Sequence, residues 1–255
     1  MKLAAVLPDM HVPYHDDLSL QLVESILSTL TLDKIIQVGD FIDGYPISRY
    51  QKKPGLNTGD ALQCELDSGR EILERWVQLS DKVVLLKGNH ESRLESYLER
   101  NAPGLYGLRS LTIPKLLDTD SLGVDYRANI YLGKLLVCHG HEVSYRGRAE
   151  SGQTARVTME RLNCPVMMGH VHRLGMYTRT TMAVGMQDGY ELGCLMDFNQ
   201  VDYMAHPNWQ QGFAIVSYED NGAKEYSVEM VPIQGFYSKN YRSAIFRGTK
   251  YSVTG

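Results

Sequence analysis

Cysteines and long apolar segments, two features that define large protein classes, are scarce in this sequence of 255 residues. Its four cysteines include no CxxC pair, so we expect free, mostly buried thiols rather than a zinc ribbon or a disulfide framework. No apolar run approaches the length needed to cross a bilayer, and the N-terminal segment MKLAAVLPDMH reaches Asp9 and His11 too early for a signal peptide. We therefore expect a cytoplasmic protein with no membrane partner.

An excess of positive charge is also absent. The formal net charge of −4 at pH 7 argues against a broad electrostatic surface for nucleic acid and leaves room only for a local basic patch. The chain has no internal repeat and no low-complexity tract. With 43% hydrophobic and 22% charged residues, its composition is that of a globular protein, and its length suits one large α/β domain.

Apolar runs alternate with helical patterns over the first two thirds of the chain. Buried strands are predicted for five runs: LAAVL (3–7), KIIQV (34–38), KVVLL (82–86), KLLVC (134–138) and PVMM (165–168). Leucine and isoleucine spacing predicts helices over residues 18–30, 62–76 and 154–162, which gives the order of a right-handed crossover fold. After residue 175, the runs MYTRTTMAV, GFAIVSY and EYSVEMVPI predict antiparallel strands of a second sheet, and the tail from about Gly235 receives no assignment.

Residues able to bind divalent cations follow each of the five apolar runs. They are Asp9 and His11 in PDMH, Asp40 and Asp43 in GDFID, Asn89 and His90 in GNHE, His139 and His141 in HGHE, and His170 and His172 in GHVH. The carboxyl ends of strands in an open α/β sheet form one rim, so these loops are predicted to converge on one crevice. From the residues alone, His90 is a further candidate ligand, and paired imidazoles at a strand end can also be ordinary half-exposed polar residues.

The ordered set DMH, GDFID, GNHE, HGHE and GHVH resembles the motifs of the calcineurin-like metallophosphoesterases, from Asp9 to His172. The segments GNHESRLESYLERNAPGL and NWQQGF are similar to members encoded by phages and mobile elements. The resemblance implies a four-layer αββα sandwich of two mixed sheets flanked by helices. It also implies a single metallophosphoesterase domain over residues 1–235, followed by an unassigned C-terminal extension, 236–255.

The resemblance implies a centre of two divalent metal ions. Asp40 matches the bridging aspartate; Asp9, His11 and His172 match the other ligands of the first ion, and Asn89, His139 and His170 those of the second. Carboxylate, amide and imidazole donors together suit manganese, iron, zinc or nickel better than calcium, and manganese is the metal we expect.

The family's chemistry needs no protein nucleophile. Two ions about 3.5–4 Å apart can hold a bridging water as hydroxide for in-line attack on phosphorus. His90 matches the histidine that protonates the departing oxygen or stabilises its charge, and Asp43 would orient its ring. His141 is expected beside the metals or facing the substrate. Arg146 and Arg148, in YRGRAESG, are our candidates for a bidentate phosphate clamp.

Departures from the family's patterns bear on the substrate. Protein phosphatases of this family have arginines in GDxxDRG and RGNHE, where this sequence has Gly44 and Lys87. We therefore favour a phosphodiesterase that acts on nucleic acid or a nucleotide. A phosphomonoesterase or protein phosphatase of the same family is one alternative, and a non-catalytic binding module that retains the fold is another. The sequence assigns no oligomeric state.

Overall fold

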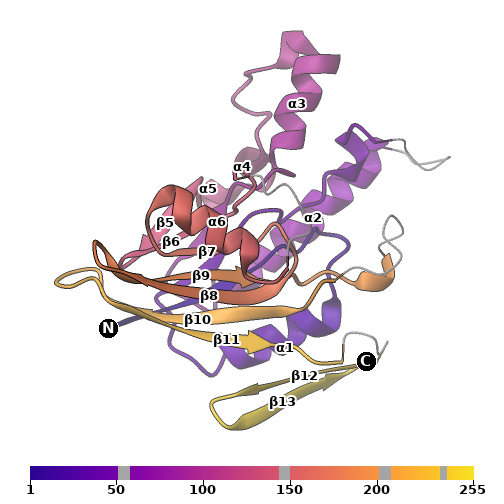
Figure 1. Ribbon diagram of the computed structural model, residues 1–255. Coiled ribbons are helices and arrows are strands. Elements are labelled where there is room, and N and C mark those ends of the chain that lie inside the picture. Colours follow the sequence, from indigo (N-terminus) through magenta and orange to yellow (C-terminus); the bar gives the residue numbers. More distant parts are fainter. Residues whose placement is uncertain (51–57, 144–149, 201–207, 236–239) are drawn as a thin grey trace.

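The computed structural model describes residues 1–50, 58–143, 150–200, 208–235 and 240–255, and its main body contains two mixed β-sheets (Figure 1). The first sheet has the order β11 (Tyr226–Pro232), β10 (Gly212–Tyr218), β1 (Lys2–Leu7), β2 (Lys34–Gln37), β3 (Val83–Leu86) and β4 (Asp125–Arg127). The second has the order β5 (Asn129–Leu132), β6 (Leu135–Cys138), β7 (Val166–Met168), β9 (Gly185–Leu192) and β8 (Leu174–Thr181). Strands β1 to β4 run parallel, and so do β6, β7 and β9.

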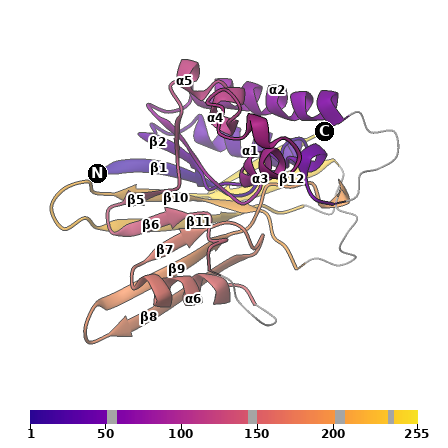
Figure 2. The same ribbon diagram turned by 90° about the horizontal axis from the view of Figure 1, so that it is seen from above.

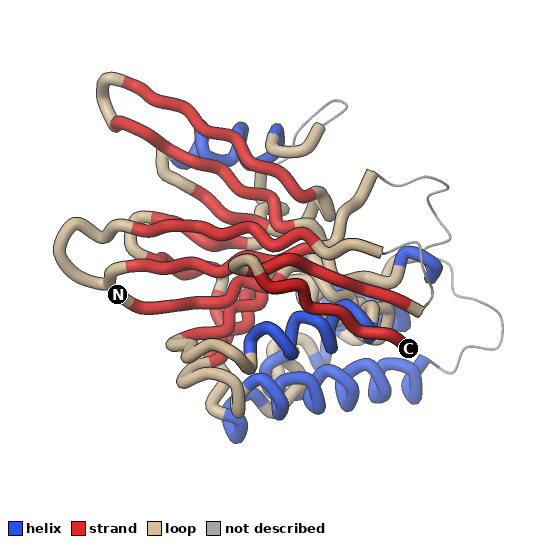
Figure 3. The backbone as a smooth tube through the Cα atoms, turned by 90° about the horizontal axis from the view of Figure 1, so that it is seen from below, coloured by secondary structure: helices blue, strands red, loops and turns tan. Residues whose placement is uncertain are grey.

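Helices lie outside both sheets. The chain forms α1 (Asp17–Leu27), α2 (Thr58–Trp76), α3 (Ser92–Asn101), α4 (Ile113–Leu116), α5 (Thr119–Leu122) and α6 (Gln153–Leu162), with short 3₁₀ turns at Tyr45–Ile47, Pro103–Leu105 and Phe198–Gln200. Helix α1 begins where the carboxylate of Asp16 accepts hydrogen bonds from the backbone N–H groups of Leu18 and Ser19. Figures 2 and 3 show the strands between α1 and α2 on one side and α6 on the other.

Three apolar clusters hold these layers together. One lies between the sheets and joins residues such as Val6 and Ile36 of the first sheet to Val137 and Met167 of the second. Another packs the outer face of the first sheet against α1 and α2, where Trp76 is fully buried. A third packs α6 against the second sheet. The predicted αββα sandwich of two mixed sheets is confirmed, and α1, α2 and α6 bury apolar faces against the sheets.

The three late apolar runs form antiparallel strands, as predicted, but the prediction that they form a second sheet was wrong. Strands β10 and β11 extend the first sheet instead, because β10 pairs antiparallel with β1, and only β8 joins the second sheet. In β10, Phe213 and Ile215 face the helix layer, whereas Ala214 and Val216 face the other sheet. A strand that is covered on both faces carries no alternation of polar residues, so its sequence does not indicate which sheet it enters.

The C-terminal tail forms a hairpin, β12 (Tyr241–Phe246) and β13 (Thr249–Thr254), that packs against α1 (Figure 1). Ala244 and Phe246 are buried in the cluster that α1 also enters, and Arg242 is buried with its Nε beside a carboxylate oxygen of Asp16. The boundary expected at residue 235 stays a prediction.

The expectation of mostly buried thiols was wrong. All four cysteines are free, but only Cys194 is buried, while Cys64 is exposed on α2 and Cys138 and Cys164 are half-buried. Among the described residues, no helix has both the length and the apolar character needed to cross a membrane.

Candidate metal centre and active site

The motif residues converge from two sheets, not from the rim of one sheet as the sequence suggested. Asp9, Asp40, and the pair Asn89 and His90 follow β1, β2 and β3 of the first sheet, whereas His139 follows β6, and His170 and His172 follow β7, of the second. Since β1 to β3 are parallel and β6 is parallel to β7, each group of loops leaves its sheet at one edge. The two edges meet, and the side chains come within hydrogen-bonding distance.

One group of side chains contains Asp9, His11 and His172, all buried. His172 Nε2 lies 3.1 Å from Asp9 Oδ2 and 3.2 Å from His11 Nε2. His11 Nε2 is also 3.9 Å from Asp40 Oδ2, so the bridging candidate borders this group. Three donor atoms that face one another in a buried space form a site for a cation.

A second group lies on the other side of the same carboxylate. His139 Nε2 is 3.3 Å from Asp40 Oδ2 and 3.0 Å from Asn89 Oδ1. The ring centroids of His139 and His170 are 5.1 Å apart. The donor atoms of Asp40, His139 and His170 all lie within 4.8 Å of one another. Asp40 thus borders both groups, as the resemblance implied for a bridging ligand.

Four of these residues have left-handed backbone conformations. The φ angles are 52° at His11, 51° at Asp40, 67° at His170 and 56° at His172. Residues with a Cβ rarely adopt these angles, and each such residue raises the free energy of the fold by about 1–3 kcal/mol. Backbone strain of this kind gathers at functional sites, where the surrounding structure holds it in place.

Backbone N–H groups hold the two aspartates in position. The N–H of His170 donates to both carboxylate oxygens of Asp9, at 3.0 Å each. The N–H of His90 donates to Asp40 Oδ1 at 2.8 Å. In each carboxylate, Oδ2 also lies close to an imidazole nitrogen, His172 Nε2 for Asp9 and His139 Nε2 for Asp40, where it can act as a ligand.

Two glycines allow the loops to approach this closely. A Cβ at Gly88 would lie 2.3 Å from both the backbone nitrogen and Oδ1 of Asp40. A Cβ at Gly169 would lie 2.0 Å from Asp9 Oδ1. No side chain fits at either position, so GNHE and GHVH need their glycines for the approach to the two carboxylates.

Glu91, the last residue of GNHE, links the loop that follows β3 to the loop that follows β2. It is buried, and its carboxylate accepts hydrogen bonds from the backbone N–H groups of Gly88, Asp40, Phe41 and Ile42. No role for Glu91 was predicted from the sequence. Its only sequence signal is its place directly after His90.

His90 lies at the edge of the first group, in contact with Asp43. Its Nδ1 is 2.8 Å from the carbonyl oxygen of Asp43 and 3.3 Å from Asp43 Oδ2. Asp43 Oδ2 is also 3.1 Å from His11 Nδ1, a contact that the motifs did not predict. Asp43 therefore touches both the expected acid and an expected metal ligand. A carboxylate behind a metal-binding imidazole fixes the orientation of its ring.

The aspartates are held in the charged form that metal binding needs. Burial alone would raise the pKa of Asp40, but His139, His90 and His11 outweigh this effect and hold the pKa well below its ordinary value. The pKa of Asp9 is also lowered, because His139 and His172 outweigh the effect of burial. Both carboxylates are therefore anions at neutral pH.

The imidazoles divide into two electrostatic classes. Burial lowers the pKa of His170 to about 4 and lowers that of His11, which leaves both rings neutral as ligands must be. Burial also acts against protonation of His139, but Asp40 outweighs it and raises the pKa to about 9, so a cation that binds there must displace the proton of this ring. For His90, Asp40 and Asp43 outweigh burial and raise the pKa, while Arg93 opposes the rise.

This donor set fits divalent cations of the first transition row. Each group offers one or two carboxylate oxygens with imidazole nitrogens, and Asn89 adds an amide oxygen to the second group. Such mixed donors suit manganese, iron, zinc or nickel. The atoms of His11, Asp40 and His90 form a third compatible group, so geometry alone keeps His90 open as a ligand.

Comparison with known proteins decides the family. The sequence model of the family described as calcineurin-like phosphoesterase matches residues 3–174. The chain belongs to the calcineurin-like phosphoesterases. The resemblance predicted from the five motifs is confirmed. Together with the Asp and His cluster, membership supports a metal-dependent phosphoesterase with a divalent metal centre.

Two phage proteins are similar to most of the chain. The Gene 54 protein of Mycobacterium phage L5 is 32% identical over 246 residues, which cover 92% of this chain and 94% of that protein. The Gene 54 protein of Mycobacterium phage D29 is 28% identical over 244 residues, with the same coverage. Among solved structures, hypothetical protein PH1004 from Pyrococcus horikoshii OT3 has a TM-score of 0.50 at 14% identity, covering 91% of this chain and 88% of that one, a likeness of fold alone.

Of the three residues expected to contact the substrate of this phosphoesterase, the structure describes only His141. His141 is half-buried, its ring centroid lies 5.2 Å from that of His139, and its Nδ1 is buried without a hydrogen-bond partner among the described residues. It lines a pocket of about 270 Å³ beside the second group. Arg146 and Arg148 lie outside the described residues.

Sequence reasoning missed two side chains that contact the phosphoesterase site. Arg93 Nη1 lies 3.1 Å from Asp43 Oδ1, and its Nη2 lies 2.9 Å from His90 Nε2. The ring of Trp209 packs edge-on against His172, with centroids 4.6 Å apart. Arg93 follows GNHE in ESR, a weak signal, and Trp209 lies in NWQQGF, outside the five motifs.

Proposed function

We propose that this chain is a two-metal phosphodiesterase that acts on nucleic acid or on a nucleotide. The observation that carries the proposal is Asp40, an anionic carboxylate that borders two separate groups of imidazoles. A carboxylate in that position serves two cations at once, which is the arrangement used for in-line displacement at phosphorus.

Each group supplies the ligands of one cation in this proposal. Asp9, His11 and His172 hold one and Asn89, His139 and His170 hold the other, with Asp40 shared. When bound, the cations polarise the phosphoryl oxygens and activate water. Manganese is our choice among the metals, with iron, zinc and nickel as alternatives.

His90 supplies the proton for the departing oxygen. Asp43 contacts its Nδ1 through both a carbonyl and a carboxylate oxygen, which supports a fixed orientation of the ring. Asp43 acts as the positioning residue, since it also contacts His11. General acid catalysis matters most for a poor leaving group such as the alkoxide of a nucleic acid strand.

Two features support a diester over a monoester. Gly44 offers no side chain where related phosphatases have an arginine. Lys87, at the other such position, has its Nζ 2.8 and 2.9 Å from the two oxygens of Glu95, so its charge is already paired. His141, Arg146 and Arg148 remain our proposals for substrate contacts. The four free thiols support the cytoplasmic location that we propose.

The experiment compares bis(4-nitrophenyl) phosphate with 4-nitrophenyl phosphate. We expect the chelator-treated protein to be inactive, to regain activity with manganese, and to have the higher kcat/KM for the diester. Full activity without metal would refute the two-metal proposal. A preference for the monoester would make the chain a phosphatase, and bound metal without turnover on any ester would make it a binding module.

A further inference from the structure

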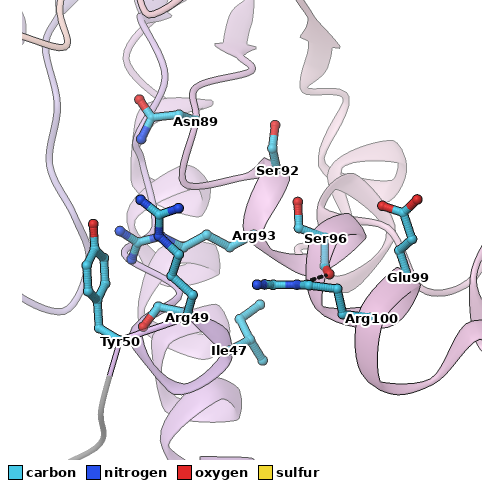
Figure 4. A pocket seen from close by; sticks show the side chains of 10 residues that line it. Ile47, Arg49, Tyr50, Asn89, Ser92, Arg93, Ser96, Glu99 and Arg100 are labelled. Atoms are coloured by element: carbon cyan, nitrogen blue, oxygen red, sulfur yellow. Dashed lines mark hydrogen bonds between the residues drawn. The ribbon is translucent and has the colours of Figure 1, made fainter.

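A pocket of about 480 Å³ begins at Asn89 and extends along one side of α3. Its polar lining includes Arg49, Tyr50, Ser92, Arg93, Ser96 and Arg100, and we call it the arginine pocket. Figure 4 shows Asn89 at one end and the side chains of Arg49, Arg93 and Arg100 extending into the space beside it. Because Asn89 is also a candidate metal ligand, the pocket adjoins the proposed reaction site.

The charge of the pocket is strongly positive. Three guanidinium groups line it, and Glu99 is the one carboxylate among its lining residues. Arg93 is paired with Asp43, but within the described ranges neither Arg49 nor Arg100 forms an ion pair with a carboxylate. Arg100 donates to the carbonyl oxygen of Ser96, which leaves its charge uncompensated. Gathered guanidinium groups repel one another, and a phosphate relieves that repulsion through paired hydrogen bonds.

The aromatic ring of Tyr50 lies beside the guanidinium group of Arg49. The side chain of Tyr50 is 60% exposed, and the guanidinium carbon of Arg49 lies 5.6 Å from its ring centroid. An exposed tyrosine flanked by arginine is the usual platform on which a base stacks in proteins that bind single-stranded nucleic acid. Ser92 and Ser96 add hydroxyl groups that can donate to phosphate or sugar oxygens.

The pocket's position relates it to the scissile phosphate. Arg93 contacts Asp43 and His90 at one end of its guanidinium and lines the pocket as well. His90 is the proposed donor to the departing oxygen, so a substrate group in the pocket belongs to the leaving side of the ester. The volume of about 480 Å³ is within the range of small-ligand pockets and suits one nucleotide.

We propose that the arginine pocket binds the nucleotide on the leaving side of the scissile phosphate in single-stranded nucleic acid. Arg49 and Arg100 bind the next phosphate, and the base stacks on Tyr50, which a base in a duplex cannot do because it is already stacked and paired. The inference rests on the proposed phosphodiesterase function. It makes a single strand, rather than a duplex or a phosphoprotein, the substrate class.

Binding in the presence of EDTA tests the pocket without turnover. The probes are a fluorescein-labelled strand of ten thymidines and a labelled hairpin duplex, followed by fluorescence anisotropy. We expect Arg49→Ala, Arg100→Ala and Tyr50→Ala each to raise the Kd for the strand about tenfold. Each arginine variant also lowers the slope of log affinity against log salt by about 0.7, the value for one lost phosphate contact on a single strand.

Arg161→Ala is the matched control, because Arg161 is an exposed arginine in the last turn of α6, on the opposite outer layer. It should leave the Kd for the strand unchanged. Thermal unfolding checks that the variants are folded. An unchanged Kd and salt slope in both arginine variants, or tighter binding of the duplex than of the strand, would overturn the inference.

Hydrolysis separates failure of the pocket from failure of the proposed function. With manganese, Arg100→Ala should lose about tenfold more kcat/KM on a thymidine trinucleotide than on bis(4-nitrophenyl) phosphate, which is too short to fill the pocket. Equal losses on both substrates would overturn the pocket and leave the phosphodiesterase intact. No hydrolysis of either ester by the wild type would reject the function, while the anisotropy result would still decide what the pocket binds.

Discussion

At the scale of single residues, the site combines backbone strain with buried charge. The left-handed conformations of His11, Asp40, His170 and His172 and the buried carboxylate of Asp9 all raise the free energy of the fold. Hydrogen bonds from backbone N–H groups and the many contacts of Glu91 offset part of this. Such an arrangement persists where function requires it.

His90→Gln tests the proposed proton donor. Glutamine keeps a polar side chain beside Asp43 and Arg93 but cannot deliver a proton, so we expect kcat to fall about 10²- to 10⁴-fold with both metals still bound. Elemental analysis of the purified variant measures the metal content, and steady-state kinetics measures the turnover.

The leaving group distinguishes acid catalysis from other roles of His90. Nitrophenolate departs without protonation, so the loss on bis(4-nitrophenyl) phosphate should be smaller than the loss on a thymidine dinucleotide. Equal losses on the two substrates would remove the acid role. A simultaneous loss of metal would instead make His90 a ligand, the alternative that its distance from Asp40 keeps open.

At the scale of helices and strands, the sequence predicts the elements whose residues form a clear local apolar pattern. The runs that became β1, β2, β3, β6 and β7 are short and almost wholly apolar, and the motif residues follow their ends. Strand β9 went unpredicted because it buries Gln187, Asp188 and Glu191. The carboxylate of Glu191 accepts from three backbone N–H groups at the start of α6, a partner that lies far along the chain.

In the site, too, contacts between residues far apart in the sequence could not be predicted. Residues within the five motifs could be predicted, because each motif combines a strand end, a glycine and a metal donor. The contacts of Arg93 and Trp209 depend on tertiary neighbours that no local pattern indicates. The hairpin was missed because its inward face carries Arg242, Ala244 and Phe246, and a buried arginine hides the apolar alternation.

The hairpin's packing on α1 gives a stability prediction. Phe246 is 3% exposed in the cluster that includes α1, so Phe246→Ala should lower the free energy of unfolding by about 3–5 kcal/mol. Ile245, the neighbour of Phe246, is 71% exposed, and Ile245→Ala should change the free energy of unfolding by no more than about 0.5 kcal/mol. Urea unfolding measures both; similar values for the two variants would show that the hairpin does not dock as described.

Helix α2 carries a buried carboxylate that makes stability depend on pH. Burial raises the pKa of Glu65 to about 8, Asp43 adds to the rise, and the N–H of Gly44, 2.7 Å from Oε2, opposes it. The folded-state pKa therefore exceeds the ordinary value of 4.5. The stabilisation of the folded state by protonated Glu65 is complete below pH 4.5 and is lost as the pH rises toward 8.

Glu65→Gln removes this dependence, because glutamine can still accept from Gly44 but does not ionise. Relative to the variant, the wild type should lose up to about 1.4 kcal/mol of unfolding free energy for each pH unit between 4.5 and 8. Urea unfolding in EDTA across this range measures the difference. Glu71→Gln, at an exposed position of the same helix, is the control, and parallel pH profiles for wild type and Glu65→Gln would contradict the argument.

At the scale of the whole molecule, the site lies where the two sheets meet. The first sheet supplies Asp9, Asp40 and Asn89, and the second supplies His139, His170 and His172. Neither sheet alone carries a complete ligand set, so the packing of one sheet on the other brings the donors together. Each proposed cation would bind ligands from both sheets.

The most direct test is an anomalous difference map from crystals grown with manganese and measured at energies on both sides of the manganese absorption edge. Our account predicts two peaks, one on each side of the Asp40 carboxylate, the first beside Asp9, His11 and His172 and the second beside Asn89, His139 and His170. No peak at Asp40 despite ample manganese, or a single peak away from it, would contradict the account.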